Sequence, residues 1–215
     1  YNTLQPSPFH WRFMDKLALR TLYEVVLPIY PKAPEHHFQD TFKAIDGIYQ
    51  SLLEEVDAKH IVIMGDGTGG ALALSYVQQL VANNQPLPNK VYLLSPMLDA
   101  TLTNPEITKD LSNKDRFVNR DGLQRIFNVW TQGEALANPL ISPIYGQLHD
   151  LPPIVLFGGG REIYHPDMKR FVYNLEDKGQ PVQFFEYPKM FHDFPLFPIR
   201  ESHKVIKQIT KTIDA

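Results

Sequence analysis

Ile61-Val-Ile-Met-Gly-Asp-Gly-Thr-Gly-Gly70 is a run of four apolar residues that leads into a glycine-rich turn. The apolar run has the length and composition of a short buried strand. The glycines indicate a tight turn, because glycine adopts backbone conformations that other residues avoid. Residues 68–82, which follow, have the length and apolar content of a helix. The stretch therefore predicts a strand, a tight turn and a helix in direct succession.

The turn has the frame of a nucleophile elbow, G-x-S-x-G, in which a strained strand-to-helix turn lifts a serine hydroxyl to the top of a sheet. Here the frame reads Gly65-Asp66-Gly67-Thr68-Gly69, so Gly67 stands where serine is needed. Glycine relieves backbone strain at such a position, and we expect the elbow to persist without its hydroxyl. Thr68 carries the only neighbouring hydroxyl, and a one-residue shift of the turn would bring it forward.

Composition limits the classes of function. The 215 residues are 43% hydrophobic with a net charge of -3, which suits a single domain over residues 1–215. Lysine and arginine number 21 against 24 acidic residues without a basic run, so no nucleic-acid partner is expected. The absence of cysteine excludes disulfides and thiol catalysis and is compatible with a cytoplasmic protein. No apolar run approaches the ~20 residues of a membrane span.

Strand-length apolar runs alternate with helix-length amphipathic segments, which is the pattern of an α/β fold with a mostly parallel sheet flanked by helices. We expect strands at residues 22–29, 60–64, 90–94, 154–157 and 182–187. We expect helices at residues 40–55, 68–82, 166–178 and 199–213. Loops at the carboxyl ends of parallel strands build the ligand crevice of such sheets, so the site is expected there.

Residues 99–143 interrupt this alternation. Two loops containing prolines flank a helical pattern at residues 120–132, in which apolar residues recur at spacings of three and four: Leu123, Ile126, Phe127 and Trp130. The segment fits a lid or cap inserted over the crevice at residues 100–142. It fits equally well a connecting helix packed on the rim of the sheet.

Several blocks then resemble one family in their order and spacing. Residues 30–38, Tyr-Pro-Lys-Ala-Pro-Glu-His-His-Phe, are similar to the Y-R-L-A-P-E-H-x-F block of hormone-sensitive-lipase-like esterases, which have the α/β-hydrolase fold. The elbow matches their G-D-S-A-G-G motif at the glycines and the aspartate. Residues 94–99, Leu-Ser-Pro-Met-Leu-Asp, resemble their S-P-x-x-D segment, and residues 141–153 resemble their approach to the next strand. The resemblance spans almost the whole chain and implies an α/β-hydrolase fold.

The resemblance also implies the other catalytic groups. Glu162 falls in the turn where the family places its acid, and His192 matches the histidine of the family's P-x-x-x-H-x-F loop. Their order after the elbow is that of α/β-hydrolases, in which a carboxylate orients an imidazole and the imidazole deprotonates a hydroxyl. In the family the residue at Thr68 offers its backbone N–H to the oxyanion, so its side chain is expected to point away from the histidine. The elbow and oxyanion region comprises Gly65, Asp66, Thr68 and Gly69.

Each residue also has a structural interpretation. Glu162 would serve as a cap for the helix expected near Pro166, where Asp167 suits the first turn by its charge. His192, between aromatic residues, fits a hydrogen-bonded structural histidine. We interpret the remaining histidines as surface or capping groups: His10, His36, His37, His60, His149, His165 and His203. The adjacent pair at 36 and 37 would point apart on an extended segment, so neither a metal site nor a cofactor is expected.

Family members carry an H-G-G oxyanion motif just before a segment like residues 1–10, and this chain begins at Tyr1. The resemblance therefore implies an upstream amino-terminal segment of roughly a hundred residues. One of its strands would lie between those expected at residues 22–29 and 60–64, because a sheet with that gap has two unsatisfied edges. Pairing of family members through late strands and helices also implies a homodimer.

Three functions are consistent with these residues. The first is a carboxylic-ester hydrolase, esterase- or lipase-like, that acts on small acyl esters and either uses an atypical nucleophile or has become inactive at Gly67. The second is a pseudoenzyme that binds a small hydrophobic or acyl ligand without turnover. The third is a hydrolase in which His192 directs water into the space beside Gly67. A deliberate replacement of serine would also explain the glycine.

Overall fold

The computed structural model describes residues 5–214. Within these residues a four-stranded parallel sheet has the order β1-β2-β3-β4. Its strands are β1 (Val62–Asp66), β2 (Lys90–Leu94), β3 (Ile154–Gly159) and β4 (Val182–Tyr187). Because all the strands run in the same direction, the loops that follow them lie at one edge of the sheet.

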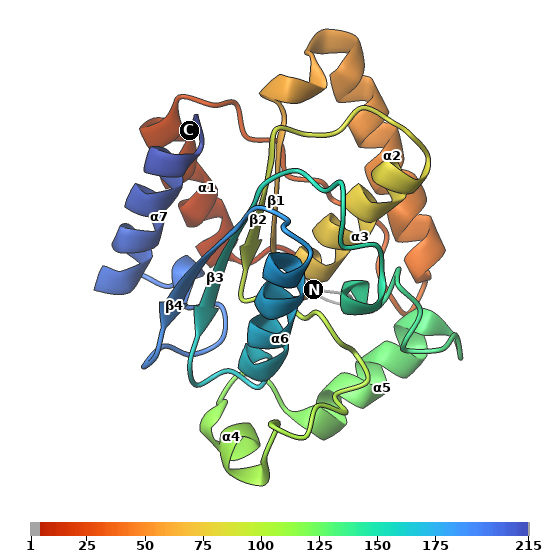
Figure 1. Ribbon diagram of the computed structural model, residues 1–215, viewed down its shortest axis with the longest axis vertical. Coiled ribbons are helices and arrows are strands. Elements are labelled where there is room, and N and C mark those ends of the chain that lie inside the picture. Colours follow the sequence, from red (N-terminus) through yellow and green to blue (C-terminus); the bar gives the residue numbers. More distant parts are fainter. Residues whose placement is uncertain (1–4, 215) are drawn as a thin grey trace.

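Helices cover both faces of the sheet, as Figure 1 shows. On one face pack α1 (Pro8–Thr21) and α7 (Arg200–Thr212), and on the other pack α2 (Phe38–Glu55), α3 (Thr68–Ala82) and α6 (His165–Asp177). The sheet is therefore the middle layer of three. Among the described residues, no helix combines the length and the apolar character needed to cross a membrane.

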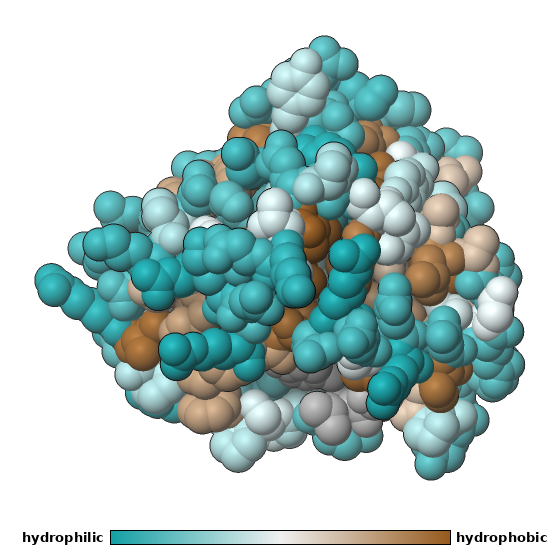
Figure 2. Space-filling view, turned by 90° about the horizontal axis from the view of Figure 1, so that it is seen from below, coloured by the Kyte–Doolittle hydropathy of each residue, from teal (hydrophilic) through white to brown (hydrophobic). Residues whose placement is uncertain are grey.

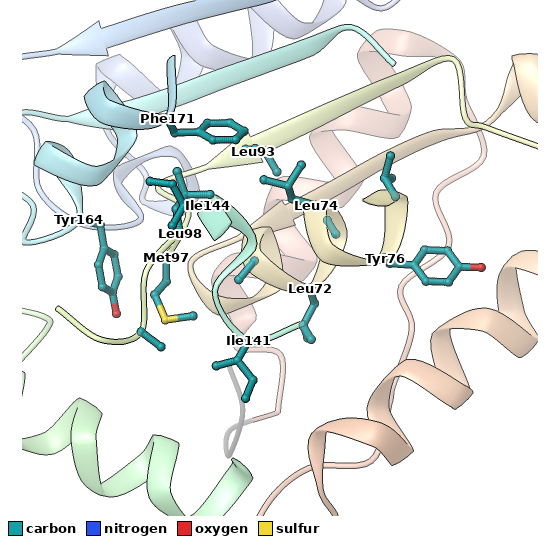
Figure 3. Packing of buried hydrophobic residues seen from close by; sticks show 14 of the residues in the cluster. Leu72, Leu74, Tyr76, Leu93, Met97, Leu98, Ile141, Ile144, Tyr164 and Phe171 are labelled. Carbon is teal, nitrogen blue, oxygen red and sulfur yellow. The ribbon is translucent and has the colours of Figure 1, made fainter. Parts of the chain in front are cut away.

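The alternation of side chains along the strands divides the core in two. Leu93 and Leu156 point toward the cluster formed with α2, α3 and α6, whereas Leu94 and Phe157 point toward the cluster formed with α1 and α7. Figure 3 shows the first cluster, in which Leu93 lies near Leu74 of α3 and Phe171 of α6. Burial on both faces explains why the central strands are continuous apolar runs.

Most predicted elements are confirmed, with small shifts at their ends. The strands at 90–94 and 182–187 and the helix at 68–82 have the predicted bounds, and β3 extends two residues beyond 157. β1 starts at Val62 rather than 60, because His60 belongs to a 3₁₀ turn (Ala58–His60). The helices at 40–55, 166–178 and 199–213 are α2, α6 and α7, each displaced by one or two residues.

Helix α1 was not predicted. Pro8 stands at its first turn, where a missing N–H costs nothing. Ser7 and His10 form a reciprocal capping box, a pattern usually completed by glutamate or glutamine rather than histidine. Phe13 and Leu17 form its short buried face.

The strand predicted at residues 22–29 is wrong. The segment runs from Leu22 without regular secondary structure, and among the described residues no strand pairs with it. An apolar, β-branched run becomes a strand only where a neighbouring chain accepts its backbone hydrogen bonds. The nearest strand, β1, is separated from residues 23–28 by cavities.

Residues 99–143 form an excursion between β2 and β3, which contains α4 (Lys109–Lys114) and α5 (Arg120–Thr131). The helix predicted at 120–132 is therefore confirmed. Its apolar stripe joins the core, since Phe127 is fully buried and Trp130 meets the Phe38 ring edge-on at 5.9 Å. Phe117, in the loop before α5, is exposed.

Candidate active site

The elbow is the junction of β1 and α3. β1 ends at Asp66, α3 begins at Thr68, and Gly67 alone separates them. Gly67 N–H donates to the carbonyl of Leu94 at 2.9 Å, and its own carbonyl accepts from Met97 N–H at 2.9 Å. These bonds fix the turn against the end of β2.

The turn needs glycine at Gly65 because two backbones meet there. A Cβ on Gly65 would lie 2.2 Å from the carbonyl oxygen of Gly69, which leaves no room for a side chain. Gly67 has φ 50° and ψ −119°, a conformation that L-residues rarely adopt. The elbow geometry is therefore present although its usual residue is not.

The Cα–Cβ direction at Gly67 defines what this position faces. A Cβ built there would lie 3.3 Å from Nε2 of His192 and 3.6 Å from Oδ2 of Asp193. A side chain at 67 would thus meet the imidazole directly. The space of the missing hydroxyl lies in front of the predicted catalytic histidine.

Glu162 follows β3 and is completely buried. Its Oε1 accepts hydrogen bonds from Gly159 N–H and from the Ser95 hydroxyl, the latter at 2.8 Å, and its Oε2 lies 3.1 Å from Nδ1 of His192. Burial raises the pKa of Glu162 to about 7, although His192, Ser95 and Gly159 N–H act to lower it. The side chain does not cap α6, whose N-cap Tyr164 makes no side-chain cap bond.

His192 lies in the loop after β4 with only 5% of its surface exposed. Its Nδ1 faces Glu162, its Nε2 lies 3.2 Å from Oδ2 of Asp193, and Tyr164 meets its ring edge-on. Burial alone would lower the pKa of His192, but the Asp193 and Glu162 carboxylates outweigh burial and hold it well above its usual value. Both ring nitrogens face acceptors, so the arrangement favours the imidazolium.

The Thr68 hydroxyl makes no hydrogen bond to His192. Its buried Oγ1 has no hydrogen-bond partner among the described residues. Thr68 begins α3, where the first backbone N–H groups lack partners within the helix. Its backbone is therefore suited to bind a negatively charged oxygen, as the family resemblance implies, and its role as an offset nucleophile stays a prediction.

Asp66 has an unpredicted partner in His10. Nε2 of His10 lies 3.1 Å from Oδ2 of Asp66, while Ser7 N–H donates to Nδ1 of the same ring. Because Nδ1 accepts, the proton of a neutral ring lies on Nε2 and is donated to Asp66. Burial acts to raise the pKa of Asp66, but the bond from His10 helps to hold it below its usual value. His10 is a capping residue as predicted, but it is buried and also fixes the elbow.

Ser95 and Asp193 were missed as site residues. Ser95 stands at the end of β2 within the S-P-x-x-D block, and Asp193 follows the histidine directly. Both have positive φ, 47° and 55°, and both are buried. Their places next to the motifs were a usable signal, but their contacts depend on three loops meeting in space.

Within residues 5–214, no group of three or more histidine, aspartate or glutamate side chains is arranged to hold a metal ion. His36, which precedes α2, instead lies 3.8 Å from the carboxylate of Asp40 in the first turn of that helix. The chemistry available in the elbow is therefore that of Glu162, His192, Asp193 and backbone donors.

Sequence comparison identifies the class of protein. A family model described as the alpha/beta hydrolase fold matches residues 2–196. The chain belongs to this family, and its resemblance to hormone-sensitive-lipase-like esterases is confirmed by solved relatives of that kind. One is a hormone-sensitive lipase from a metagenome library, 27% identical with a TM-score of 0.90 over 95% of this chain and 69% of that one.

Three further relatives are described by their activity or expected activity. A candidate esterase from Staphylococcus aureus, known by crystal structure, is 56% identical with a TM-score of 0.98, over 100% of this chain and 72% of that one. An esterase of Acinetobacter venetianus is 34% identical over 87% of this chain and 62% of its own length. A triacylglycerol lipase of Mycobacterium tuberculosis is 29% identical over 90% of this chain and 40% of its own. The chain thus spans less than two thirds of these two curated relatives.

Proposed function

We propose that this chain carries the acid and histidine of a carboxylic-ester hydrolase site for small acyl esters, with Gly67 at the nucleophile position. The observation that supports this most directly is the 3.3 Å separation between a Cβ at Gly67 and Nε2 of His192. The printed activities of the relatives, esterase and lipase, agree with it. In such a site His192 takes a proton from the attacking hydroxyl and returns it to the leaving group, while Glu162 orients the ring.

The same geometry supports a second function, that of a pseudoenzyme which binds an acyl or hydrophobic ligand without turnover. Gly67 supplies no hydroxyl, and Nε2 of His192 already faces the carboxylate of Asp193. Binding survives loss of the covalent step, because shape and apolar contacts do not depend on the nucleophile. Direction of water by His192 into the space beside Gly67 is the third and least supported candidate.

A small hydrophobic ligand would meet aromatic residues beside the histidine. Phe117 stacks on Phe191, the neighbour of His192, with ring centroids 5.1 Å apart, and Phe197 packs against both. Phe9 of α1 stacks on Phe197 at 4.9 Å. Figure 2 views the end of the molecule where α4 and α5 lie and shows hydrophobic residues reaching the surface between hydrophilic ones. Phe117 is 54% exposed, which suits contact with an acyl chain.

We propose that residues 100–142 act as the lid of this site. The base of the excursion is fixed by a buried network, in which Arg170 of α6 lies 2.8 Å from Asp99 and Asn104 donates to Asp167 at 2.8 Å. Asp115 also accepts from Ile163 N–H, next to the catalytic acid. These anchors would leave Phe117 beside the crevice whatever the lid does elsewhere.

An upstream segment remains part of the proposal. Cavities of about 440 and 180 Å³ lie between residues 23–28 and β1, the larger facing α2 and α3 and the smaller facing α1. Ile61 accepts a bond from Asn89 and Gly67 donates to Leu94, so odd-numbered residues of β1 bond toward β2. The backbone groups of Val62 and Met64 therefore face the cavities. An extended strand from a segment preceding residue 1 would satisfy them.

We expect the amide of Met64 to exchange slowly with solvent in the full-length protein, because a strand in this slot would accept its hydrogen bond. Native-state hydrogen exchange measures this directly. The amide of Ile63, which bonds toward β2, serves as the internal control and should be slow in any case. Exchange of Met64 at the rate of an open edge would show that no strand occupies the slot.

The homodimer and the cytoplasmic location stay predictions. Both concern properties of the whole protein rather than of the site. Size-exclusion chromatography with light scattering on the full-length protein measures the first. Fractionation of the source cells measures the second.

Turnover of short p-nitrophenyl esters by the full-length protein tests the two leading functions. We expect turnover, if an offset nucleophile exists, to disappear with Thr68→Ala. Thr210→Ala, a change at a partly exposed position of α7 outside the excursion, is the control for general loss of a threonine. Turnover that survives Thr68→Ala excludes Thr68 as the nucleophile, whereas saturable ligand binding without any turnover supports the pseudoenzyme.

A further inference from the structure

Four residues form a closed ring of contacts that includes the imidazole of His192. The Ser95 hydroxyl donates to Oε1 of Glu162 at 2.8 Å, and Oε2 of Glu162 faces Nδ1 of His192 at 3.1 Å. Nε2 of His192 faces Oδ2 of Asp193 at 3.2 Å. The backbone N–H of Asp193 then donates to the Ser95 hydroxyl oxygen at 3.2 Å. Each member is therefore held by its two neighbours in the ring.

The ring of contacts occupies Nε2, the imidazole nitrogen that catalysis needs. A general base must present Nε2 to the attacking hydroxyl, within about 2.6–3.2 Å. Here Asp193 lies at that distance from Nε2, and its Oδ2 is 3.6 Å from the Cβ position of residue 67. The carboxylate and an incoming hydroxyl would therefore compete for one ring nitrogen.

The backbone holds Asp193 in this position. Asp193 has φ 55°, and the residue is 2% exposed. Its carbonyl accepts a hydrogen bond from Leu196 N–H, and this bond closes a 3₁₀ turn (Phe194–Leu196). Ser95, its partner, has φ 47° and is fully buried. Positive φ is uncommon and energetically unfavourable for residues other than glycine, and here two such residues lie on facing loops. Residues in such conformations cluster at functional sites.

We propose that Asp193 is a positioning residue that closes the Nε2 edge of His192, with Ser95 as the clamp that joins Asp193 to Glu162. The inference rests on the proposed function, because it concerns the same histidine. It assigns the imidazole two carboxylate partners instead of one. As long as Asp193 occupies Nε2, His192 donates to it and does not act as a base.

Few other ionisable groups lie around the imidazole of His192. Glu162 and Asp193 contact it, Tyr164 meets it at 5.2 Å between ring centroids, and Asp66 lies close enough for its charge to interact with it. Tyr164 is uncharged over the neutral range, since burial raises its pKa well above the usual value. Removal of the Asp193 carboxylate is therefore a change of one charge among three.

Asp193→Gly tests the proposal most directly. Glycine keeps the backbone N–H that donates to Ser95 and accepts the positive φ without strain, so only the carboxylate is lost. We expect the pKa of the His192 ring, followed by NMR titration of its imidazole signals, to fall by about one unit or more, as for loss of a neighbouring opposite charge. Asp193→Asn, which removes the charge and keeps a side chain tolerated at positive φ, should move it in the same direction.

Asp150→Asn provides the matched control. Asp150 lies 2.7 Å from Nδ1 of His149 on the surface, so this change removes a carboxylate beside a different histidine and should leave the His192 titration unchanged. An unchanged His192 titration in folded Asp193→Gly and Asp193→Asn proteins would overturn the proposal. If only one variant folds, its titration decides the question.

A second measurement separates this inference from the proposed function. In the Gly67→Ser background, Asp193→Gly should shift the onset of covalent labelling by an organophosphate to lower pH by the same amount as the titration. A fall in the His192 pKa without labelling in either background would contradict the proposed hydrolase site and leave the role of Asp193 intact. Labelling whose pH onset does not move would contradict the role of Asp193 alone.

Discussion

Gly67→Ser in the full-length protein should turn a site without a nucleophile into one that an organophosphate labels covalently. The reason is geometric, because a Cβ at residue 67 lies 3.3 Å from Nε2 of His192 and its hydroxyl would reach the ring. We expect labelling to rise from none to about one probe per chain, measured by intact-protein mass spectrometry. Peptide mapping should place the adduct at residue 67.

The pH dependence of this labelling has a definite sign. A protonated His192 cannot accept the serine proton, and the two carboxylates hold its pKa well above the usual value although burial opposes them. Labelling should therefore increase as the pH rises through that raised pKa. Gly67→Ala, which adds the Cβ without the hydroxyl, is the matched control. A folded full-length Gly67→Ser protein that does not label at any pH would contradict our assignment of Glu162 and His192.

Glu162→Gln in the Gly67→Ser background should reduce the labelling rate by about 10⁴-fold, the order seen when the orienting acid of a triad becomes an amide. The amide keeps the size of the side chain but presents a neutral group to Nδ1 of His192. The ring then loses the charge that stabilises its protonated form. Samples of the labelling reaction, stopped at successive times, give the rate.

Glu176→Gln, at an exposed position of α6, is the control for removing a glutamate charge from the molecule. Its labelling rate should equal that of the parent variant. A Glu162→Gln protein that labels as fast as its parent would mean that Glu162 is a structural residue only. Circular dichroism of both variants distinguishes loss of rate from loss of fold.

The sequence predicted the parts of the fold that depend on local pattern. Strands β2 and β3 are buried along their whole length, so each is a largely apolar run that stands out from its neighbours, whereas β4 is only partly buried and carries Gln183 and Glu186 among its apolar residues. Residues 22–29 carry the same signal, yet they form no strand, because pairing depends on a partner that local pattern does not supply. Helix α1 was missed for the opposite reason. It forms although its apolar pattern is weak, since only Phe13 and Leu17 with His10 form its buried side.

The site residues also fall into a predicted group and an unpredicted group. Gly67, Glu162 and His192 were predicted because each lies in a motif with a fixed place in chain order. Ser95, Asp193 and His10 were not, because their roles arise from contacts between loops. Asp193 illustrates the difference, since it follows the histidine directly and its contact with Nε2 depends on an uncommon backbone conformation.

The ring around His192 also ties together distant parts of the chain. Ser95 and Glu162 are 67 residues apart, Glu162 and His192 are 30 apart, and Ser95 and Asp193 are 98 apart. Contacts of such long range form only after the entropy of closing large loops has been overcome. The ring therefore exists only when β2, β3 and β4 stand side by side, and the imidazole signal of His192 reports completion of the sheet during folding.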